Sequence, residues 1–463
     1  MRNKNAQNVQ NASPAPGKVS SLLAALLLGG AAVPATAADL LQVYRQALDN
    51  DPQFLAARHQ LDAGREKEAQ GLSGLLPTLG VAGNTQWNDV DRELRGSSAA
   101  PIKAKYNSNG YTATLTQPLF RWQNIVSYQQ GKMQAAQAEA QFAQARQDVI
   151  LRVATAYFDV LLAEVNLSSL QAQKKAIAQQ LEQAKKNFEV GTATIVDTHE
   201  AQSRFDLATA QEIAADSELE IKRRALEVII GRDPGSLALV REKVALDPPQ
   251  PPAMKPWLEA AEKDAIAVQL QQLALEIADK EVSRSRGGHY PTLDAVVARG
   301  NASQTAALPT LGGGIAPGFE TNSTTAALQL NIPIFQGGYV NSKTREAAAN
   351  REAARQQLEA ARRNAAQAAR QAYLGVSNGT AQVGALRAAL VSSQSSLESN
   401  KLGYEVGVRI NIDVLNAEQQ VYVTRRDLAR AFHDTLLSQL KLKAAVGTLD
   451  EDDLAKINAL LQQ

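Results

Sequence analysis

An internal repeat of more than 200 residues runs through this sequence and limits the folds open to it. The tripeptide Pro-Thr-Leu at Pro77 recurs 214 residues later, at Pro291. The pair Val-Gly that ends at Gly191 recurs 216 residues later, at Gly407, so the spacing stays nearly constant along the chain. Solenoid repeats have periods of about 20–50 residues. Each half of this chain is therefore predicted to be a whole structural unit.

The repeat and the local composition divide the chain into five segments. Basic residues, an apolar run and a site of small residues predict a signal peptide over residues 1–37. The first repeat is assigned to residues 38–246 and the second to residues 257–449. Between them, residues 247–256 are rich in proline, which cannot continue a helix, and form the predicted linker. Residues 450–463 are the C-terminal tail, whose acidic run is expected to be solvated.

Each repeat contains two stretches in which apolar and small polar residues alternate, as is typical of strands. In the first repeat these stretches flank a polar segment over residues 88–109. In the second repeat they cover residues 293–299 and 324–332, around a glycine-rich loop at Gly312–Gly314. Strands of about ten residues with one apolar face, joined by long polar loops, suit an outer-membrane barrel. A soluble sandwich sheet would show the same alternation, so the pattern alone leaves both open.

The helical segments give a stronger signal than the strands. Residues 123–189 and 339–405 contain no proline and are rich in alanine, glutamine and charged residues. At 1.5 Å per residue, a helix of this length reaches about 100 Å, which is typical of coiled coils. Apolar positions on more than one flank favour a wall of neighbouring helices over a two-stranded rope. A further helix is predicted over residues 39–74.

Four strands in one chain are too few to close a transmembrane barrel. The smallest such barrels have about eight strands, and an open edge in lipid leaves backbone groups unpaired. Two chains would give a barrel filled by side chains, whereas three would give twelve strands and a lumen. We therefore expect cyclic assembly around a pore. The predicted fold class is mostly α-helical, with a helical coiled-coil barrel and a membrane β-barrel to which each protomer adds four strands.

Composition and motif content exclude several classes of function. The 48 Lys and Arg residues balance 47 Asp and Glu residues, whereas nucleic-acid-binding proteins usually carry a basic excess. The chain has no cysteine, and its four histidines lie far apart without the spacing of a metal site. No nucleophile–base pairing or nucleotide motif is present. We therefore predict no catalytic residue, cofactor or metal, and no enzymatic activity.

The order of elements, the paired Val-Gly turns and one longer segment resemble the outer-membrane channel-tunnel family typified by TolC. That segment reads Tyr-Glu-Val-Gly-Val-Arg-Ile-Asn-Ile-Asp-Val-Leu-Asn-Ala-Glu from Tyr404 to Glu418. The resemblance covers essentially all of the chain after residue 37, and the missing cysteine matches the non-lipidated, secretion-linked branch. It implies a homotrimer in the outer membrane of a Gram-negative bacterium, extending into the periplasm. The implied partners are outer-membrane lipid, a periplasmic adaptor protein and an inner-membrane ABC or RND transporter.

The resemblance also implies a periplasmic gate at the two helical turns. In the family, hydrogen bonds and salt bridges between neighbouring helices hold these turns closed. Carried over by motif, Tyr404 would bond Asp197, and Arg409 would bond a polar group at the position of Val196. Valine has no side-chain acceptor, so Asp197 and a backbone carbonyl both stay open as partners of Arg409.

A selectivity ring in the lumen is implied beside the gate. In the family, two acids three residues apart in the second repeat form this ring, and these positions are Asp413 and Asn416 here. Glu200 of the first repeat would supply the missing negative charge if it faces the lumen. Gly191 and Gly407 are predicted to form the left-handed turns at the tip. Apart from the resemblance, an aspartate just after such a turn is more often a helix cap.

The leading function is a passive exit duct of a tripartite export system, and the C-terminal match favours type I protein secretion. The first alternative is the outer-membrane component of a pump for drugs and other small molecules. A more distant alternative is a structural or adhesive coiled-coil envelope protein, which explains the long helices but not the strands at fixed places in each repeat. A periplasmic enzyme on a helical scaffold is disfavoured because no catalytic constellation is visible.

Overall fold

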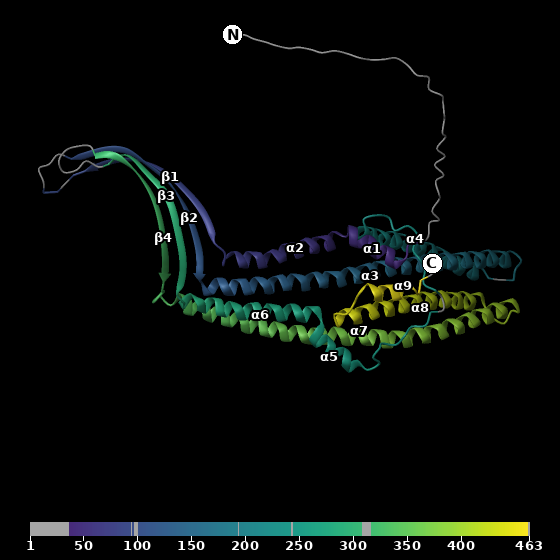
Figure 1. Cartoon of the computed structure of the whole chain (residues 1–463). Helices are drawn as coiled ribbons and strands as arrows, with labels where there is room; N and C mark the ends of the chain where they lie inside the picture. The colour runs from purple at the N-terminus through teal and green to yellow at the C-terminus, as the bar shows by residue number, and fades with distance from the viewer. Residues whose placement is uncertain are drawn as a thin grey trace, which may run out of the picture. The chain divides into compact units, whose positions relative to one another are not determined.

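The computed structural model describes residues 37–93, 95–96, 101–192, 194–241, 244–307 and 316–461. Long helices lie side by side and lead at one end into a four-stranded sheet that curves away from them (Figure 1). Apart from Ala37, the predicted signal peptide lies outside the described residues, as does the glycine-rich loop at Gly312–Gly314.

The same series of elements occurs twice, so α2–β1–β2–α3–α4 corresponds to α6–β3–β4–α7–α8. The first half contains α1 (Leu40–Asn50), α2 (Pro52–Ser73), β1 (Thr78–Arg92), β2 (Ile102–Phe120), α3 (Trp122–Glu189) and α4 (Ile195–Ile230). The second half contains α5 (Met254–Asp264), α6 (Ile266–Arg286), the 3₁₀ turn η1 (Gly287–His289), β3 (Thr292–Ala307), β4 (Ala316–Asn331), α7 (Tyr339–Glu405), α8 (Asn411–Ala445) and α9 (Glu451–Asn458).

The single helix predicted over residues 39–74 is wrong, because the segment forms two helices that meet at Asp51. The backbone of Asp51 is extended, and its side chain accepts a hydrogen bond from the amide of Gln53 at 3.1 Å. Pro52 then occupies the first position of α2, where its missing N–H has no partner to lose. Asp51 is 3% exposed and also forms an ion pair with Arg152 of α3. The ion pair therefore joins the junction between α1 and α2 to the long helix α3.

The two very long helices are confirmed, with 68 residues in α3 and 67 in α7. Small residues let α2 approach α3 closely. A Cβ atom on Gly131 would lie 2.4 Å from the carbonyl oxygen of Lys67, and one on Gly64 would lie 2.2 Å from the Cβ of Ala138. Gly131 and Ala138 are seven residues apart, which puts them on one face of α3. Among the described helices, none has both the length and the apolar composition needed to cross a membrane.

The strands pair in the order β1-β2-β3-β4, each antiparallel to the next, and are longer than predicted. The polar segment over residues 88–109 is not a loop throughout, because β1 continues to Arg92 and β2 begins at Ile102. Cross-strand ion pairs extend the ladder there: Lys105 lies 3.0 Å from Asp89, and Lys103 lies 3.2 Å from Asp91. The pattern of apolar residues located only the part of each strand next to the helices.

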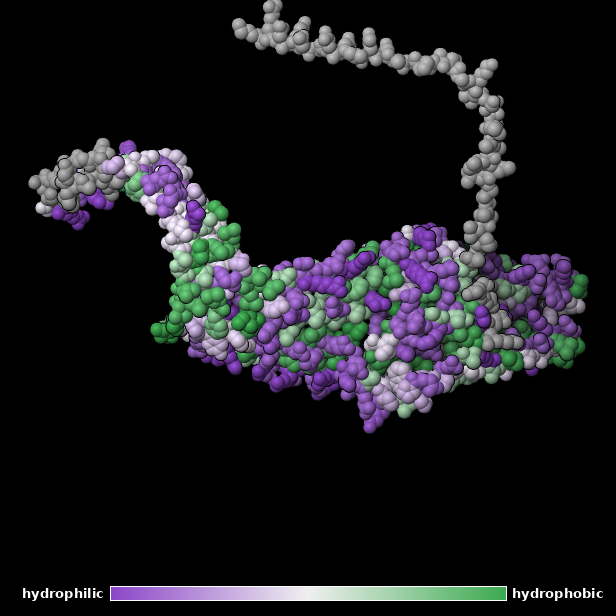
Figure 2. Space-filling view, viewed as in Figure 1, coloured by the Kyte–Doolittle hydropathy of each residue, from purple (hydrophilic) through white to green (hydrophobic). Residues whose placement is uncertain are grey.

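The two faces of the sheet differ in chemistry. One row across the strands consists of Leu79, Leu115, Val297 and Ala326, while the adjoining row on the other face consists of Gly80, Thr114, Ala298 and Thr325. Figure 2 shows hydrophobic residues gathered over the part of the sheet that adjoins the helices, whereas the helical surface is largely hydrophilic. The outer edges of β1 and β4 have no strand partner within the described part of the chain. A sheet with one apolar face and two free edges is suited to closure with further copies.

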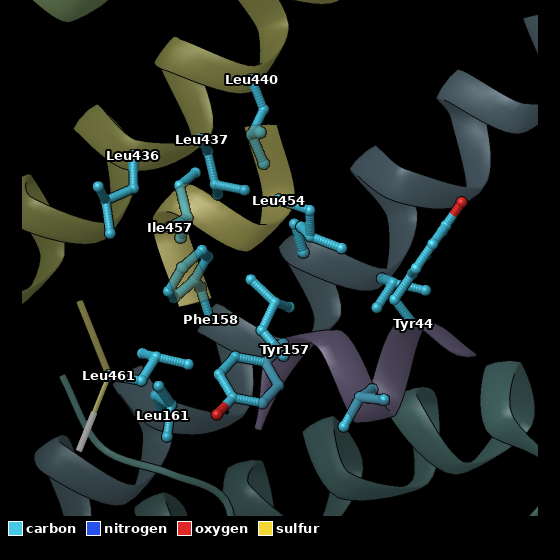
Figure 3. Packing of buried hydrophobic residues seen from close by; sticks show 14 of the residues in the cluster. Tyr44, Tyr157, Phe158, Leu161, Leu436, Leu437, Leu440, Leu454, Ile457 and Leu461 are labelled. Atoms are coloured by element: carbon cyan, nitrogen blue, oxygen red, sulfur yellow. The ribbon is translucent and has the colours of Figure 1, made fainter. Parts of the chain in front are cut away.

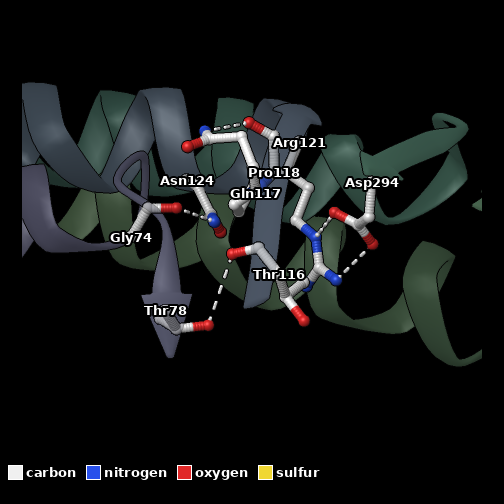
Figure 4. A network of polar contacts seen from close by, with 8 residues as sticks. All are labelled: Gly74, Thr78, Thr116, Gln117, Pro118, Arg121, Asn124 and Asp294. Atoms are coloured by element: carbon white, nitrogen blue, oxygen red, sulfur yellow. Dashed lines mark hydrogen bonds and ion pairs between the residues drawn. The ribbon is translucent and has the colours of Figure 1, made fainter. Parts of the chain in front are cut away.

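A polar network joins the sheet to the helices (Figure 4). Arg121, just before α3, donates two hydrogen bonds to the carboxylate of Asp294 in β3, at 2.8 and 2.6 Å. Gln117 donates to the carbonyl oxygen of Leu75 at 2.9 Å, and Asn124 donates to that of Gly74. Asp294 is only 6% exposed, so its carboxylate depends on the paired arginine. This ion pair explains the charge that interrupts the apolar alternation of the third strand.

The main apolar core lies about midway along the helices, where α1, α3, α8 and α9 meet (Figure 3). Tyr157 is fully buried, and its hydroxyl donates to the carbonyl oxygen of Ala238 at 2.8 Å. The acidic run of the tail starts a helix: Asp450 caps α9 and is exposed, as is Asp452, whereas Leu454 and Ile457, further along the tail, pack into the core. The helix that follows the acidic run is amphipathic, so Leu454 and Ile457 fall on one face.

One histidine is buried in this core and forms no ion pair with any described residue. His433 of α8 stacks on Phe158, with ring centroids 5.1 Å apart, and is 6% exposed. Its Nδ1 has no hydrogen-bond partner among the described residues. Burial lowers the pKa of His433 to about 4, despite the opposing influence of Asp159.

We predict that His433 makes the helical part less stable in acid. Its pKa lies below the ordinary value in the folded state, so its neutral form stabilises the fold above about pH 6.5, and this contribution is lost as the pH falls towards 4. His433→Phe should remove roughly 3 kcal/mol of acid-dependent destabilisation between pH 7 and 4, measured by denaturant unfolding followed by circular dichroism. His59→Gln, at an exposed histidine, is the control. Parallel loss of stability in wild type and His433→Phe would contradict the prediction.

Candidate functional site at the helical turns

The candidate site is the end of the molecule where α3 turns into α4 and α7 turns into α8. Gly191 and Gly407 both have φ of +79°, a backbone conformation that other residues rarely adopt. A Cβ at either position would meet no atom within 4 Å, so conformation rather than space requires glycine. The two turns are therefore equivalent, as the repeat predicted.

Asp197 caps the start of α4. Its carboxylate accepts from the amide of Thr194 at 2.9 Å, and its own amide donates to the Thr194 hydroxyl at 3.3 Å. Such a reciprocal capping box satisfies amides that have no partner inside the helix. Asp413 lies in the first turn of α8, and its carboxylate is 3.6 Å from Arg409 Nη1. Both aspartates thus stabilise helix starts within one chain.

Tyr404 and Arg409 do not contact Asp197 within one chain. The Tyr404 hydroxyl accepts a hydrogen bond from Asn187 of α3 at 3.2 Å, so the expected Tyr404–Asp197 bond is not formed inside the protomer. Arg409 pairs with Asp413 of its own segment instead of with Asp197 or a backbone carbonyl. Asn187 was not singled out from the sequence, although it lies four residues before the glycine turn.

Glu200 and Asn416 are brought together by Arg204, a residue that the sequence did not single out. Arg204 Nη2 donates to Asn416 Oδ1 at 3.2 Å, and Nη1 donates to Gln419 Oε1 at 3.0 Å. The same guanidinium lies 3.9 Å from Glu200 Oε1. The negative charge of Glu200 is therefore partly offset by a cation on its own helix.

A buried carboxylate lies slightly further from the turns. Glu418 of α8 is 3% exposed, accepts a hydrogen bond from Gln180 of α3 at 3.1 Å, and lies 3.8 Å from Lys401 of α7. Burial raises the pKa of Glu418, and Lys401 opposes this only in part. The sequence held a signal for this residue, because Glu418 falls on the same helical face as Val414 and Val421. A charge within an apolar stripe is a candidate for a functional group.

No group of three or more acidic, histidine or cysteine side chains is placed to hold a metal ion anywhere in the described part of the chain. The chemistry of the turns is that of amides, carboxylates and guanidinium groups that link neighbouring helices. Such an arrangement can hold helices together or release them, and it can present charge to passing ions.

Comparisons with known proteins agree with this architecture. The family model described as outer membrane efflux protein matches residues 43–232 and 257–448. The outer membrane protein TolC of Vibrio cholerae is 34% identical over 450 residues, covering 96% of this chain and 99% of that protein. The alkaline protease secretion protein AprF of Pseudomonas aeruginosa is 31% identical, covering 92% and 88%. The CmeC outer membrane channel of Campylobacter jejuni superposes with a TM-score of 0.76 at 17% identity, covering 91% and 89%.

The family model and the identity to TolC place this fold, in which long helices continue a β-sheet, among the outer-membrane channels. The chain belongs to the outer membrane efflux protein family, so the resemblance to TolC is confirmed. Family membership places it in the outer membrane of a Gram-negative bacterium and classes it as a channel protein, not as an enzyme. It also removes the structural or adhesive coiled-coil alternative.

We predict that Glu418 makes the helices near the turns less stable as the pH rises. Because its pKa is raised in the fold, its stabilising contribution is complete below about pH 4.5 and is lost as the pH rises through the folded value. Tyr422 of the same helix and Lys401 are the ionisable groups that interact with it. Glu418→Gln keeps an acceptor for Gln180 and removes the ionisation. It should abolish the pH-dependent part of hydrogen exchange over residues 411–426, after correction for intrinsic rates.

Glu398→Gln, at an exposed glutamate of α7, is the matched control and should behave like the wild type. Equal pH dependence in the wild type and in Glu418→Gln would mean that Glu418 does not control the stability of this region.

Proposed function

We propose that three copies of this chain form the outer-membrane exit duct of a tripartite export system. The observation that carries the proposal is the sheet, which continues into helices of 68 and 67 residues and whose β1 and β4 edges have no strand partner among the described residues. Free edges cannot face lipid, so β4 of one copy pairs with β1 of the next until the barrel closes. Three copies give twelve strands and a lumen, whereas two give a filled barrel.

The duct is passive, and the energy that drives transport through it comes from its partner proteins. A periplasmic adaptor protein and an inner-membrane ABC or RND transporter deliver the substrate, and outer-membrane lipid surrounds the apolar face of the sheet. The apolar row formed by Leu79, Leu115, Val297 and Ala326 supports the lipid contact. The family membership supports the partners.

Type I protein secretion is the proposed pathway. Its support is the 31% identity to the alkaline protease secretion protein AprF over 92% of this chain. Small-molecule efflux is the second candidate, supported by the family description, outer membrane efflux protein. The two pathways differ in cargo and not in the duct, so the cargo has to be measured.

The experiment that tests the pathway is deletion of the gene in the bacterium that makes the protein. Loss of one or a few secreted proteins, with unchanged sensitivity to dyes and detergents, would support secretion. Raised sensitivity with an unchanged set of secreted proteins would support efflux. Neither effect, in a strain where the protein is normally present in the outer membrane, would overturn the export function.

The gate is proposed to lie at the tip turns of Gly191 and Gly407, with Asp197, Tyr404 and Arg409 holding neighbouring helices together. Within a protomer, Tyr404 binds Asn187 and Arg409 pairs with Asp413. Asp197 is proposed to meet Arg409 of a neighbouring copy. The selectivity ring is proposed to consist of Asp413, Asn416 and Glu200, which lie close to the same turns.

We predict that Asp413→Ala reduces cation selectivity, because a ring of carboxylates in a narrow constriction attracts cations, and its loss leaves Arg409 unpaired. Reversal potentials of single channels in a planar lipid bilayer measure this effect. Asp434→Ala is the matched control, since Asp434 also lies four residues after an arginine, Arg430, whose Nε is 3.9 Å from its carboxylate. Unchanged selectivity in Asp413→Ala would place the filter elsewhere, with Glu200 the next residue to change.

We predict that Tyr404→Phe combined with Arg409→Ser raises the single-channel conductance, because two polar contacts near the turns are lost together. Tyr373→Phe combined with Arg430→Ser is the control. It removes the hydrogen bond that the Tyr373 hydroxyl of α7 donates, together with an arginine of α8, and both lie away from the turns. Equal conductance of the wild type and the Tyr404/Arg409 variant would mean that other contacts hold the tip closed.

A further inference from the structure

A groove separates two helices of different repeats above the turns. Its walls include Gln211 and Glu218 of α4 on one side and Tyr422 and Arg426 of α8 on the other. Residues of α3, such as Ser169, line its floor, and its volume is about 370 Å³. The backbones of α4 and α8 are thus held apart here, and each packs on α3.

Arg204 of α4 reaches across to α8 towards the turn end of this groove. One nitrogen of its guanidinium donates to Asn416 Oδ1 at 3.2 Å, and another donates to Gln419 Oε1 at 3.0 Å. Asn416 and Gln419 are three residues apart, so their side chains lie on one face of α8. Gln419 also lines the groove, so the contact adjoins the open part of the boundary.

Two further polar contacts cross the boundary between the repeats near the turns. Gln180 of α3 donates to Glu418 of α8, and Asn187 of α3 donates to Tyr404 of α7. Both come from α3, which already packs against α8. Arg204 differs because it comes from α4 and makes two hydrogen bonds from one rigid planar group.

We propose that Arg204 is a positioning residue that clasps α4 to α8 and so holds the two helical hairpins of a protomer in the closed arrangement. The proposal rests on the proposed channel function and adds to it a gate contact made by a residue outside the turn motifs. Glu200, one helical turn before Arg204 and 3.9 Å from it, orients the guanidinium from its own helix. Because both acceptors are neutral amides, the clasp does not depend on pH near neutrality.

The contacts with Asn416 and Gln419 require the two guanidinium nitrogens of arginine, and not its charge alone. Lysine would keep the charge but has a single nitrogen, which cannot reach Asn416 and Gln419 in the same way. Arg204→Lys should therefore restore the wild-type hydrogen exchange and closed-state conductance only in part, compared with Arg204→Gln. A residue that acted through charge alone would be fully restored by lysine.

The test uses the purified full-length channel in detergent and in planar bilayers, with variants Arg204→Gln, Arg204→Lys, Asn416→Ala/Gln419→Ala and the combination of Arg204→Gln with that pair. In Arg204→Gln, hydrogen exchange over residues 411–426 should become about tenfold faster, as expected for losing hydrogen bonds to a charged donor. Closed-state conductance should rise in the same variant. The combined variant should go no further than Arg204→Gln, because all of these changes remove the same contact.

Arg224→Gln is the matched control, since the ion pairs of this α4 arginine among the described residues are with Glu220 and Glu227 of its own helix. Exchange and conductance in Arg204→Gln that match Arg224→Gln would overturn the proposal, as would fully additive effects in the combined variant. If neither the wild type nor the variant with Tyr404 and Arg409 replaced ever conducts, the channel function is contradicted. The hydrogen-exchange measurement would still show whether Arg204 holds α4 to α8.

Discussion

The backbone N–H and C=O groups at the two outer edges of the sheet need hydrogen-bond partners, and much of the architecture follows from this need. The strands β1 and β4 each expose a row of N–H and C=O groups, and the sheet next to them carries an apolar face. In lipid, such groups have no water to bind, so an isolated copy would be unstable there. Closure with further copies is the proposed solution, and it would fix the arrangement of the helices that follow each strand.

The helices transmit that arrangement from the membrane to the turns. Arg121 and Asp294 join the start of α3 to β3, so the two repeats are tied together where the sheet ends. Large apolar side chains, Tyr157 and Phe158 among them, then fill a core midway along the helices. Beyond it, the described residues form two small apolar clusters around Ile177 and Leu181, and polar contacts link the helices. Apolar packing is therefore sparse next to the turns, where the gate is proposed.

The elements that the sequence predicted best are those set by local rules. The long helices α3 and α7 follow from uninterrupted stretches without proline, and the tip turns follow from Gly191 and Gly407. Pro52 indicates the break between α1 and α2, but the helical composition on both sides of it favoured a single helix. The strands were underestimated, because their outer halves are stabilised by cross-strand ion pairs and not by apolar residues.

The polar contacts of the candidate site were less predictable for a different reason. Arg204 and Asn416 are more than 200 residues apart, and nothing local in the sequence relates them. Asp294 interrupts an apolar pattern, and only the position of Arg121 explains why. Family resemblance supplied the residues of the turns, whereas it gave no indication of contacts specific to this chain.

Native mass spectrometry from detergent gives the mass of the intact assembly and so tests whether the sheet edges pair between copies. One species of three chains is expected, because twelve strands close a barrel with a lumen. A stable species of one or two chains, extracted from the outer membrane in folded form, would contradict it. Such a result would mean that the edges of β1 and β4 are satisfied in another way.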